Sequence, residues 1–579
     1  MYTEFLLQAL SLIGGLAFFL YGMNVMGDGL TRLSGGRLER ILEKLTDNRI
    51  KAVLLGAGVT AVIQSSSATT VTVVGFVNSG IMKLNQAIGV IMGANIGTTV
   101  TSWILSLTGI EGNNLLVTLL KPTSFTPILA IIGIFLIMAS KQEKRKDIGA
   151  IMIGFAILMF GMDTMSAAVK PLADVPQFTH ILTMFSNPIL GMLAGAILTA
   201  IIQSSSASVG ILQALCLTGS VPYATAIPII MGQNIGTCVT ALLSSIGAGK
   251  NAKRAALVHL YFNVIGTTVF MIVFYSLYAF IDFSFMHDAA GVAGIAVIHS
   301  LFNIGATILL FPFANMLEKL ATLTIREDEE ETTSEFARLD SRFLDSPALA
   351  LEQCERSANE MAYLTLENVT LALEGIHDYS EEKRNQVIEM EEKIDRYEEE
   401  IGEYLRQIAN RNVIVEEYAK WNLLVYCIRD LERISDHTIN IMSEAAKISK
   451  SKAVWPKKLK EEMNFYAEQV HDIVSTTVSA FIKDDGTLAN VIEEKETQID
   501  DINKRIKKQN LKRVKKEKTS PEIGIYVNEL AINYERMADH CENIAMSLVS
   551  EQENEAGGVP LVEAMFFNIP IIAYDSSAI

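Results

Sequence analysis

Long apolar stretches in the first 320 residues constrain the fold of this chain more than any other feature. Examples are residues 6–26, 148–169, 255–281 and 291–317. A hydrocarbon layer of about 30 Å is crossed by about 20 helical residues, so each stretch can span a membrane. Because backbone inside a membrane must satisfy its own hydrogen bonds, we expect these spans to be helices. The first stretch follows the acidic Glu4 without a basic region or a cleavage site, which predicts a retained membrane helix and not a removed signal.

Charge divides the chain near residue 325. Residues 1–325 hold 17 Lys and Arg against 13 Asp and Glu, whereas the remainder holds 31 against 52. So acidic a C-terminal part makes nucleic acid an unexpected partner. We predict a membrane domain in residues 1–325, a charged linker in 326–344 and a soluble domain in 345–550. The five cysteines include no CxxC pair and indicate neither a disulfide framework nor a zinc site.

Three short strings occur twice in the membrane domain. FLYGM at 19–23 matches LMFGM at 158–162, QSSSA at 64–68 matches QSSSA at 203–207, and MGANIGTT at 92–99 matches MGQNIGTC at 231–238. Every pair is separated by 139 residues, which indicates an internal duplication in register. We place repeat 1 at about residues 5–140 and repeat 2 at about 147–280, with extra helices to residue 317.

The distribution of basic residues indicates that the two repeats are inverted. Residues 27–51 carry six Lys or Arg side chains, but the matching residues 166–190 carry only Lys170. Since short cytoplasmic loops are enriched in Lys and Arg, equivalent loops are expected to face opposite sides. The predicted fold is all-α: a polytopic membrane protein with two inverted repeats and broken or re-entrant helices, joined to a soluble helical bundle. Everything after Arg326 is expected to be cytoplasmic.

The two QSSS strings are candidates for a ligand site. Each lies in sequence without Lys, Arg, Asp or Glu, at residues 52–82 and 175–249. A polar cluster at membrane depth must be satisfied by protein, ions or water. Gly, Ser and Asn interrupt helices, and the N-terminal end of a broken helix attracts an anion. Two inverted breaks are expected to meet near the midplane. Because the strings offer only neutral donors, a bound oxyanion needs co-bound cations, which favours a cation-coupled carrier over a channel.

These paired strings and their apolar flanks resemble the type II sodium/phosphate cotransporter family over roughly residues 5–315. The resemblance implies Na⁺-coupled movement of inorganic phosphate across the cytoplasmic membrane by alternating access. The substrate contacts that it implies are Gln64, Ser65, Ser66, Ser67, Gln203, Ser204, Ser205 and Ser206. The sodium ligands that it implies draw on Asn95, Thr98, Thr99, Asn234 and Thr237. No nucleophile–base constellation is evident, so no enzyme activity is expected.

A further short similarity joins HLYFN at 259–263 to HSLFN at 299–303. Each string places a His and an Asn four residues apart, on one face of a helix. Hydrogen bonding between helices is the simpler interpretation, and a role beside the ion path is the alternative.

The C-terminal part has a helical pattern of apolar residues, with about six helices from residue 335 to 550. Carboxylates recur four residues apart in the pairs Glu391/Asp395, Glu432/Asp436, Glu496/Asp500 and Glu535/Asp539. Their spacing predicts two three-helix units. Such pairs of like charge destabilise a helix by about 0.2–0.5 kcal/mol each. Neighbouring Arg433 and Arg536, or hard cations that bridge adjacent helices, are the alternatives for offsetting them.

The strings ERISDH and ERMADH resemble the PhoU-type domain, a phosphate-regulatory module of three-helix repeats, over about residues 345–548. The resemblance implies iron or divalent metal at the eight carboxylates, and regulation of a phosphate carrier by the attached bundle. A tail at 551–579 has no assigned role. Its apolar end, residues 557–579, is similar to a donor-sugar-binding stretch of retaining glycosyltransferases but is too short to form that fold.

Three other functions remain open from the sequence. The chain could carry another oxyanion, export phosphate, or sense phosphate as a receptor that transports nothing. The expected partners are phosphate, sodium ions and the lipid bilayer, while a homodimer and the sodium stoichiometry are left open.

Overall fold

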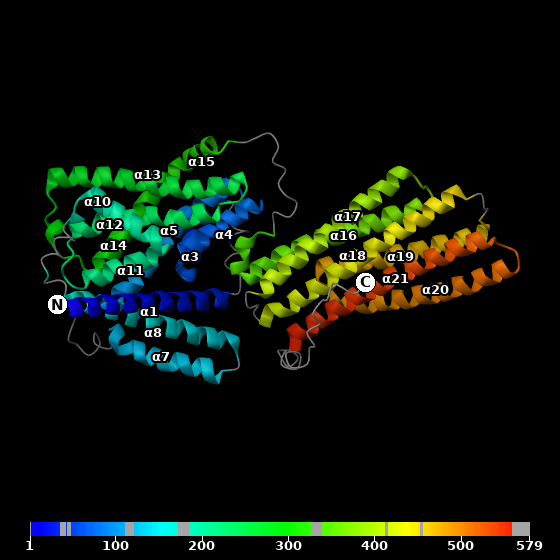
Figure 1. Cartoon of the computed structure of the whole chain (residues 1–579), viewed down its shortest axis with the longest axis horizontal. Coiled ribbons are helices and arrows are strands. Elements are labelled where there is room, and N and C mark those ends of the chain that lie inside the picture. The colour runs from blue at the N-terminus through cyan, green and yellow to red at the C-terminus, as the bar shows by residue number, and fades with distance from the viewer. Residues whose placement is uncertain are drawn as a thin grey trace. The chain divides into compact units, whose positions relative to one another are not determined.

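The chain folds into helices that form two compact units, Met1–Phe343 and Leu344–Ile579 (Figure 1). This computed structural model describes residues 2–34, 42, 48–110, 121–140, 142–171, 175, 184–326, 339–410, 415–451 and 455–557. Among these residues the β-structure is limited to one isolated bridge, Pro222–Ala289. The apolar tail at 558–579, most of the predicted linker and several basic residues of the 27–51 segment lie outside the described residues.

Among the described residues of the first unit, six helical segments are long and apolar enough to span a membrane. They are Leu6–Leu33, Leu84–Gly109, Lys144–Val169, Tyr223–Ser244, Lys250–Ile281 and Val292–Thr324. The four apolar stretches of the sequence lie in α1 (Tyr2–Ser34), α8 (Glu143–Val169), α13 (Lys250–Ile281) and α14 (Val292–Leu310) with α15 (Ala314–Thr324). The prediction of a polytopic helical membrane domain is therefore confirmed.

Equivalent helices of the two repeats run in opposite directions. In α1, Gly15 faces Met165 of α8 and Gly22 faces Leu158, so partners in α8 descend as numbers in α1 ascend. Gly22 and Gly161 are equivalent positions, and each lets the other helix approach its backbone. This antiparallel pair is the structural signature of the inverted repeat.

Each repeat then forms a pair of short helices followed by one long helix. Repeat 1 has α3 (Arg49–Ile63), α4 (Ser66–Asn78) and α5 (Leu84–Ser106), and repeat 2 has α10 (Pro188–Ile202), α11 (Ser205–Cys216) and α12 (Tyr223–Ser244). Gly93 and Gly232 let α5 and α12 lie against the backbones of α3 and α10, where a Cβ would overlap a carbonyl. The helix α7 (Pro122–Ala139) packs on α8 through Gly133 and Gly149.

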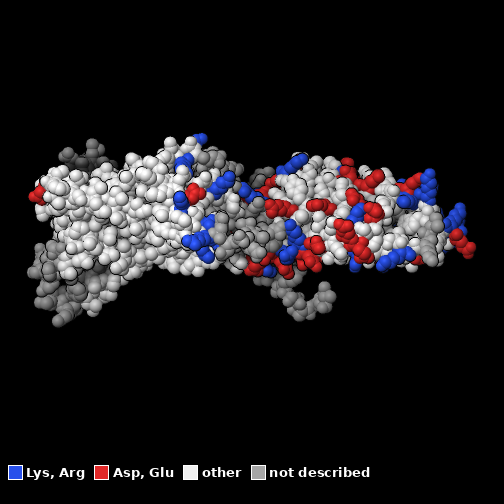
Figure 2. Space-filling view, turned by 90° about the horizontal axis from the view of Figure 1, so that it is seen from above, with Lys and Arg blue, Asp and Glu red and all other residues white. Residues whose placement is uncertain are grey.

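Figure 2 shows a long uncharged surface over the membrane unit, with Lys and Arg gathered near one end. Several basic residues of this unit lie at helix ends: Arg32 lies in the last turn of α1, Arg49 begins α3, and Lys250 begins α13. Arg32 forms an ion pair with Asp147 of α8 at 2.8 Å. Basic residues that flank an apolar surface are typical of the cytoplasmic end of a membrane domain.

The second unit is a bundle of six long helices, as the sequence predicts. They are α16 (Pro347–Gly375), α17 (Glu381–Ala409), α18 (Val415–Lys450), α19 (Lys457–Lys483), α20 (Ala489–Lys515) and α21 (Pro521–Gly557). Two groups of three, α16–α18 and α19–α21, repeat one pattern. Buried aromatic side chains such as Tyr466 and Tyr534, whose ring centroids lie 5.0 Å apart, join α19 to α21 in the core.

Candidate functional site

Each membrane repeat contains a helix break, and the two breaks lie at equivalent glutamines. Gln64 ends α3 with φ of 61°, and Gln203 ends α10 with φ of 59°. A side chain in this left-handed region costs about 1–2 kcal/mol, so it occurs where the surrounding structure requires it. The backbone amides still close the last turns, on Thr60 O at 2.8 Å and Thr199 O at 2.7 Å. The chain therefore reverses sharply at two equivalent positions.

A new helix starts directly after each break. Ser65 caps α4 by accepting a hydrogen bond from the Ala68 amide at 3.1 Å, and Ser204 caps α11 through the Ala207 amide at 3.2 Å. Serine is a strong N-cap residue, which explains why each helix begins here. The first amides of a helix have no intrahelical acceptor, and this end carries partial positive charge. Each repeat thus presents a short helix whose N-terminus begins with two further serines.

The two helix N-termini meet at the centre of the membrane unit. Ser66 Oγ and Ser205 Oγ lie 3.5 Å apart, and both side chains are buried. Ser67 Oγ donates to the Gln203 carbonyl at 3.3 Å. The structure therefore brings the two predicted strings together from sequence positions 139 residues apart. Paired helix N-termini and neutral hydroxyls form a surface that suits an oxyanion.

Thr101 of α5 links both strings, and the sequence analysis missed it. Its hydroxyl donates to Gln64 Oε1 at 2.9 Å and accepts from Ser206 Oγ at 3.3 Å. Thr101 follows the duplicated GxNIGT string and has an in-register equivalent, Thr240. That recurrence is the signal that could have identified it.

Two of the predicted sodium ligands, Asn95 and Asn234, are held by the His–Asn strings. Asn95 Nδ2 donates to Asn263 Oδ1 at 3.1 Å, and Asn234 Nδ2 donates to Asn303 Oδ1 at 2.6 Å. His299 Nδ1 contacts Ser102 Oγ at 2.7 Å. The strings at 259–263 and 299–303 therefore form hydrogen bonds between helices, and each string contacts both repeats.

The remaining predicted sodium ligands are buried hydroxyls. Thr98 and Thr237 donate to carbonyls one turn back in their own helices, at 3.1 and 3.0 Å, and Thr99 donates to Ile96 O at 2.7 Å. This leaves their oxygen lone pairs as acceptors. Gln233, which replaces Ala94 in repeat 2, is fully buried, and its amide atoms have no hydrogen-bond partner within the described protein. Buried polar groups usually have partners, so Gln233 is a further candidate for contact with water or an ion.

The first group of predicted metal ligands lies on α17 and α18 of the bundle. Glu391 on α17 lies close enough to Asp436 on α18 to share a hydrogen bond, and burial followed by the Asp436 charge raises the pKa of Glu391 to about 7. The same causes raise the pKa of Glu432 to about 7. Asp395, one turn after Glu391, is exposed to solvent, and its charge makes a smaller contribution to both shifts. Carboxylates of two adjacent helices thus share one acidic surface.

The second group lies on α20 and α21, and ion pairs are its main feature. Asp500 pairs with Lys504 at 2.5 Å, and Asp539 pairs with Arg536 at 3.3 Å. Glu535 lies 3.8 Å from the ammonium of Lys507. Ion pairs offset part of the charge of this second group, while burial and neighbouring carboxylates also raise the pKa of Glu496 and of Asp539.

The structure does not assemble the predicted metal ligands into a metal site. Among the residues that the structure describes, no set of three or more His, Cys, Asp or Glu is arranged to hold one metal ion. In the first group Glu391 pairs with Asp436 of the neighbouring helix, and Asp395 is exposed to solvent. The expectation of a resident metal cluster is not supported by this arrangement. It concerned Glu391, Asp395, Glu432, Asp436, Glu496, Asp500, Glu535 and Asp539, and their metal role stays a prediction.

Two family models match the chain. The Na⁺/Pi-cotransporter model matches twice, at residues 18–167 and 157–317, and the PhoU domain model matches at residues 358–445 and 464–548. The starts of the two cotransporter matches differ by the repeat offset of the sequence. Each double match thus reproduces one of the two internal duplications.

Known proteins are similar to the whole of this chain or to part of it. YjbB of Salmonella typhimurium, named for inorganic phosphate export, is 24% identical over 512 residues, covering 86% of this chain and 90% of the relative. The sodium-dependent phosphate transport protein 2A of Rattus norvegicus is 35% identical over 105 residues, covering 18% of this chain and 16% of the relative. The crystal structure of PhoU from Streptococcus pneumoniae aligns with 36% of this chain and 97% of its own, at 21% identity and a TM-score of 0.33.

Proposed function

The chain belongs to the Na⁺/Pi-cotransporter family and carries a PhoU domain, and from this premise we propose that it carries inorganic phosphate across the cytoplasmic membrane by alternating access, coupled to Na⁺. The observation that supports the proposal most is the meeting of Ser66 and Ser205 at the N-termini of α4 and α11. Phosphate offers oxygens that accept from these hydroxyls and from the first amides of both helices. The substrate residues are Gln64, Ser65, Ser66, Ser67, Gln203, Ser204, Ser205 and Ser206.

Sodium coupling follows from the charge of this site. The serine strings and their described hydrogen-bond partners are neutral, so helix ends alone offset only part of the charge of a phosphate anion. The proposed sodium ligands, Asn95, Thr98, Thr99, Asn234 and Thr237, supply amide and hydroxyl oxygens beside the anion. Na⁺ bound there lowers the electrostatic cost of carrying phosphate through the membrane.

The direction of net movement is a second part of the proposal. A relative that covers most of this chain is named for phosphate export. The same broken-helix site serves either direction, because the gradients and the coupling decide net flux. We therefore propose phosphate efflux as the candidate alternative to Na⁺-driven uptake. The PhoU-like bundle is proposed to lie in the cytoplasm and to regulate this flux.

Radiolabelled phosphate flux in proteoliposomes tests the function. We expect wild-type flux to require Na⁺, and Ser66→Ala and Ser205→Ala to lose most of it while remaining folded. Ser106→Ala is the matched control, because Ser106 ends α5 and donates to the carbonyl of Trp103 in its own helix. Flux that is unchanged when choline replaces Na⁺ contradicts the coupling. Phosphate binding without flux identifies a receptor, and equal competition by sulfate identifies a broader oxyanion carrier.

A further inference from the structure

The end of α4 that lies away from the serines is held by a segment from outside the repeats. We call residues 340–343 the latch. They follow the last membrane helix and precede α16, which begins at Pro347. Asp340 is 7% exposed and Phe343 is fully buried, and both belong to the membrane unit. The latch is therefore packed into this unit although it was predicted to be a charged linker.

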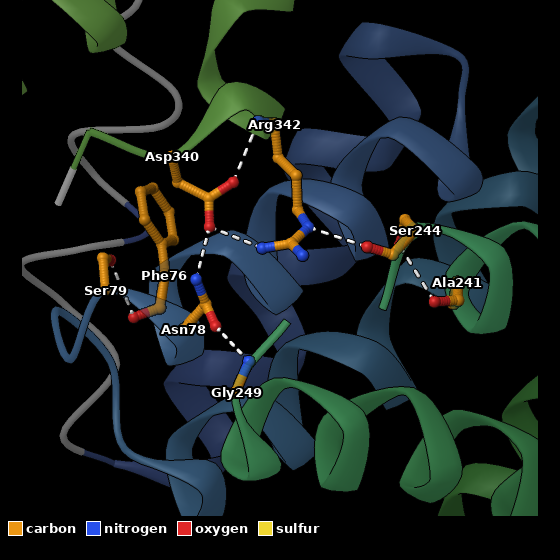
Figure 3. Close-up of polar contacts among 8 residues, drawn as sticks. All are labelled: Phe76, Asn78, Ser79, Ala241, Ser244, Gly249, Asp340 and Arg342. Carbon is orange, nitrogen blue, oxygen red and sulfur yellow. Dashed lines mark hydrogen bonds and ion pairs between the residues drawn. The ribbon is translucent and has the colours of Figure 1, made fainter. Parts of the chain in front are cut away.

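Asp340 controls a hydrogen bond between the two repeats. Asn78, the last residue of α4, donates from Nδ2 to Asp340 Oδ2 at 2.7 Å (Figure 3). Its Oδ1 accepts from the Gly249 amide, which caps α13 in repeat 2, at 2.9 Å. An amide has one donor end and one acceptor end, so the Asp340 carboxylate fixes which end faces Gly249. A single carboxylate thereby orients the contact that joins repeat 1 to repeat 2.

Arg342 extends this network to the end of α12. Its Nη1 pairs with Asp340 Oδ2 at 2.5 Å, and its Nε donates to the carbonyl of Ser244 at 2.8 Å (Figure 3). Ser244 is the last residue of α12, where carbonyls lack intrahelical donors and carry partial negative charge. The cationic side chain therefore satisfies the end of a helix that carries proposed sodium ligands.

Phe343 adds apolar contact on the same helix. Its ring centroid lies 5.4 Å from that of Phe76 in α4. The ring occupies space that Gly75 leaves open, since a Cβ on Gly75 would lie 2.7 Å from it. The latch thus holds α4 by a hydrogen bond and an aromatic contact.

The equivalent turn of repeat 2 is held by backbone hydrogen bonds. Between α11 and α12, the Val221 carbonyl accepts from the Ala290 amide at 2.7 Å, and the Tyr223 amide donates to the Asp288 carbonyl at 3.1 Å. These are backbone bonds, which do not depend on side-chain charge. The hydrogen bond between the latch and α4 instead depends on one carboxylate, and only a few residues of chain separate the latch from the first helix of the PhoU-like bundle.

We propose that Asp340, Arg342 and Phe343 are positioning residues that hold the two repeats together at the latch end, and that each transport cycle requires α4 to be released from them. The inference rests on the proposed function. Because α4 carries Ser66 at one end and Asn78 at the other, about 18 Å along one helix at 1.5 Å per residue, movement at Asn78 is transmitted to the substrate site.

Reversal of donor and acceptor tests the contact without a change in volume. Asn78→Asp places a carboxylate against Asp340, so repulsion replaces the hydrogen bond. Adding Asp340→Asn restores the bond in the opposite sense, because the amide introduced at position 340 donates to the carboxylate introduced at position 78. Since Asp340 Oδ2 also accepts from Arg342, the carboxylate at position 78 keeps one negative charge beside the guanidinium. The second oxygen of that carboxylate still accepts from Gly249. Asn48→Asp is the matched control, since Asp also caps α3 and adds the same charge.

Two measurements on the full chain in proteoliposomes decide the outcome. The rate of hydrogen exchange in peptides that cover the last turn of α4 and residues 247–253 is expected to rise about tenfold in Asn78→Asp. A tenfold change is what the loss of one hydrogen bond to a charged group would cause. The maximal phosphate flux is expected to rise about threefold, with KM changed less than about twofold, because a barrier to release is lowered. The double variant returns both values toward wild type.

The proposal that the latch holds α4 is wrong if hydrogen exchange is unchanged in Asn78→Asp. It is also wrong if exchange in the double variant is as fast as in Asn78→Asp alone. Increased exchange with a lower maximal flux and a raised KM also overturns the release step, because the contact then only supports the serine site. If wild type moves no phosphate, the proposed function fails, and the exchange pattern alone still decides whether the latch holds α4.

Discussion

Ser66 and Ser205 are equivalent residues of the two repeats, and their hydroxyl oxygens lie 3.5 Å apart. A contact between equivalent positions indicates that the pseudo-twofold axis relating the repeats passes between the two side chains. Each serine then offers the ligand the same group from the opposite direction. A tetrahedral oxyanion, which presents acceptors on all sides, matches such a site better than a planar or linear ion does.

Close packing between α3 and α5 depends on Gly56 and not on Gly58. A Cβ at Gly56 would overlap the Val90 carbonyl, whereas a Cβ at Gly58 meets nothing within 4 Å. Gly56→Ala is expected to lower stability by about 1–3 kcal/mol through overpacking. Gly58→Ala, in the same helix, is expected to be neutral or to stabilise by about 0.5–1 kcal/mol. The temperature at which the monodisperse gel-filtration peak is lost in detergent measures both, and equal midpoints would contradict the packing.

The left-handed cap at Gln203 makes a second prediction about stability. Gln203→Gly relieves the backbone at φ of 59°, a gain of about 1–2 kcal/mol that the greater flexibility of glycine in the unfolded chain reduces by about 0.5–1 kcal/mol, so a small net stabilisation is expected. Gln203→Val places a β-branched side chain in the same conformation and is expected to destabilise by about 1–2 kcal/mol. The same gel-filtration assay ranks the variants. A ranking with Val above Gly would show that the break in α10 is not as described.

The repeat architecture could be predicted because its causes are local and periodic. Apolar length predicted the spans, the offset of 139 residues predicted the duplication, and the asymmetry of Lys and Arg predicted the inversion. Polar strings in charge-free sequence predicted where the helices break. That Gln64 and Gln203, and not a glycine, adopt the left-handed conformation could not be predicted, because tertiary packing overrides the local preference there.

The contacts between residues far apart in the sequence could not be predicted. Asn78 and Asp340 are 262 residues apart, and nothing in the surrounding residues pairs them. Thr101 looked like an ordinary helix residue until the fold placed it between the two serine strings. The spacing of the carboxylate pairs could be recognised in the sequence. Only the fold shows that Glu391 lies within hydrogen-bonding reach of Asp436 on another helix.

The two asparagine contacts predict matched effects on the proposed sodium site. Asn263→Ala leaves the buried Asn95 amide without its partner, and Asn303→Ala does the same to Asn234, at a cost of about 1–3 kcal/mol each. We expect each variant to raise the Na⁺ concentration for half-maximal phosphate flux about tenfold, since a tenfold change corresponds to about 1.4 kcal/mol. Thr268→Val on α13 is the control, because Thr268 is exposed and donates to the Val264 carbonyl of its own helix. An unchanged Na⁺ dependence in both alanine variants would remove these asparagines from the ion site.

The first carboxylate group predicts how the stability of the bundle depends on pH. The pKa of Glu391, about 7, lies above its ordinary value of 4.5, and that of Glu432 is raised as well. The folded state therefore binds more protons than the unfolded state between about pH 4.5 and 7. The free energy of unfolding of the bundle is therefore expected to be higher at low pH, where Glu391 and Glu432 are protonated. This contribution is lost as the pH rises through the pKa of the folded state.

Replacement of Asp436, whose charge acts on both Glu391 and Glu432, tests this pH dependence of stability. Asp436 is the charge that contributes most to both shifts, ahead of Asp395. Asp436→Asn removes its repulsion, so the pKa of Glu391 and Glu432 is expected to fall toward 4.5, and the bundle is expected to gain stability at pH 7.5 more than at pH 5. Thermal unfolding of the full chain, followed by circular dichroism at both pH values, measures the difference. Glu389→Gln, an exposed position on the same helix as Glu391, serves as the control. A gain of equal size at both pH values would mean that charge repulsion among these carboxylates does not limit the stability of the bundle.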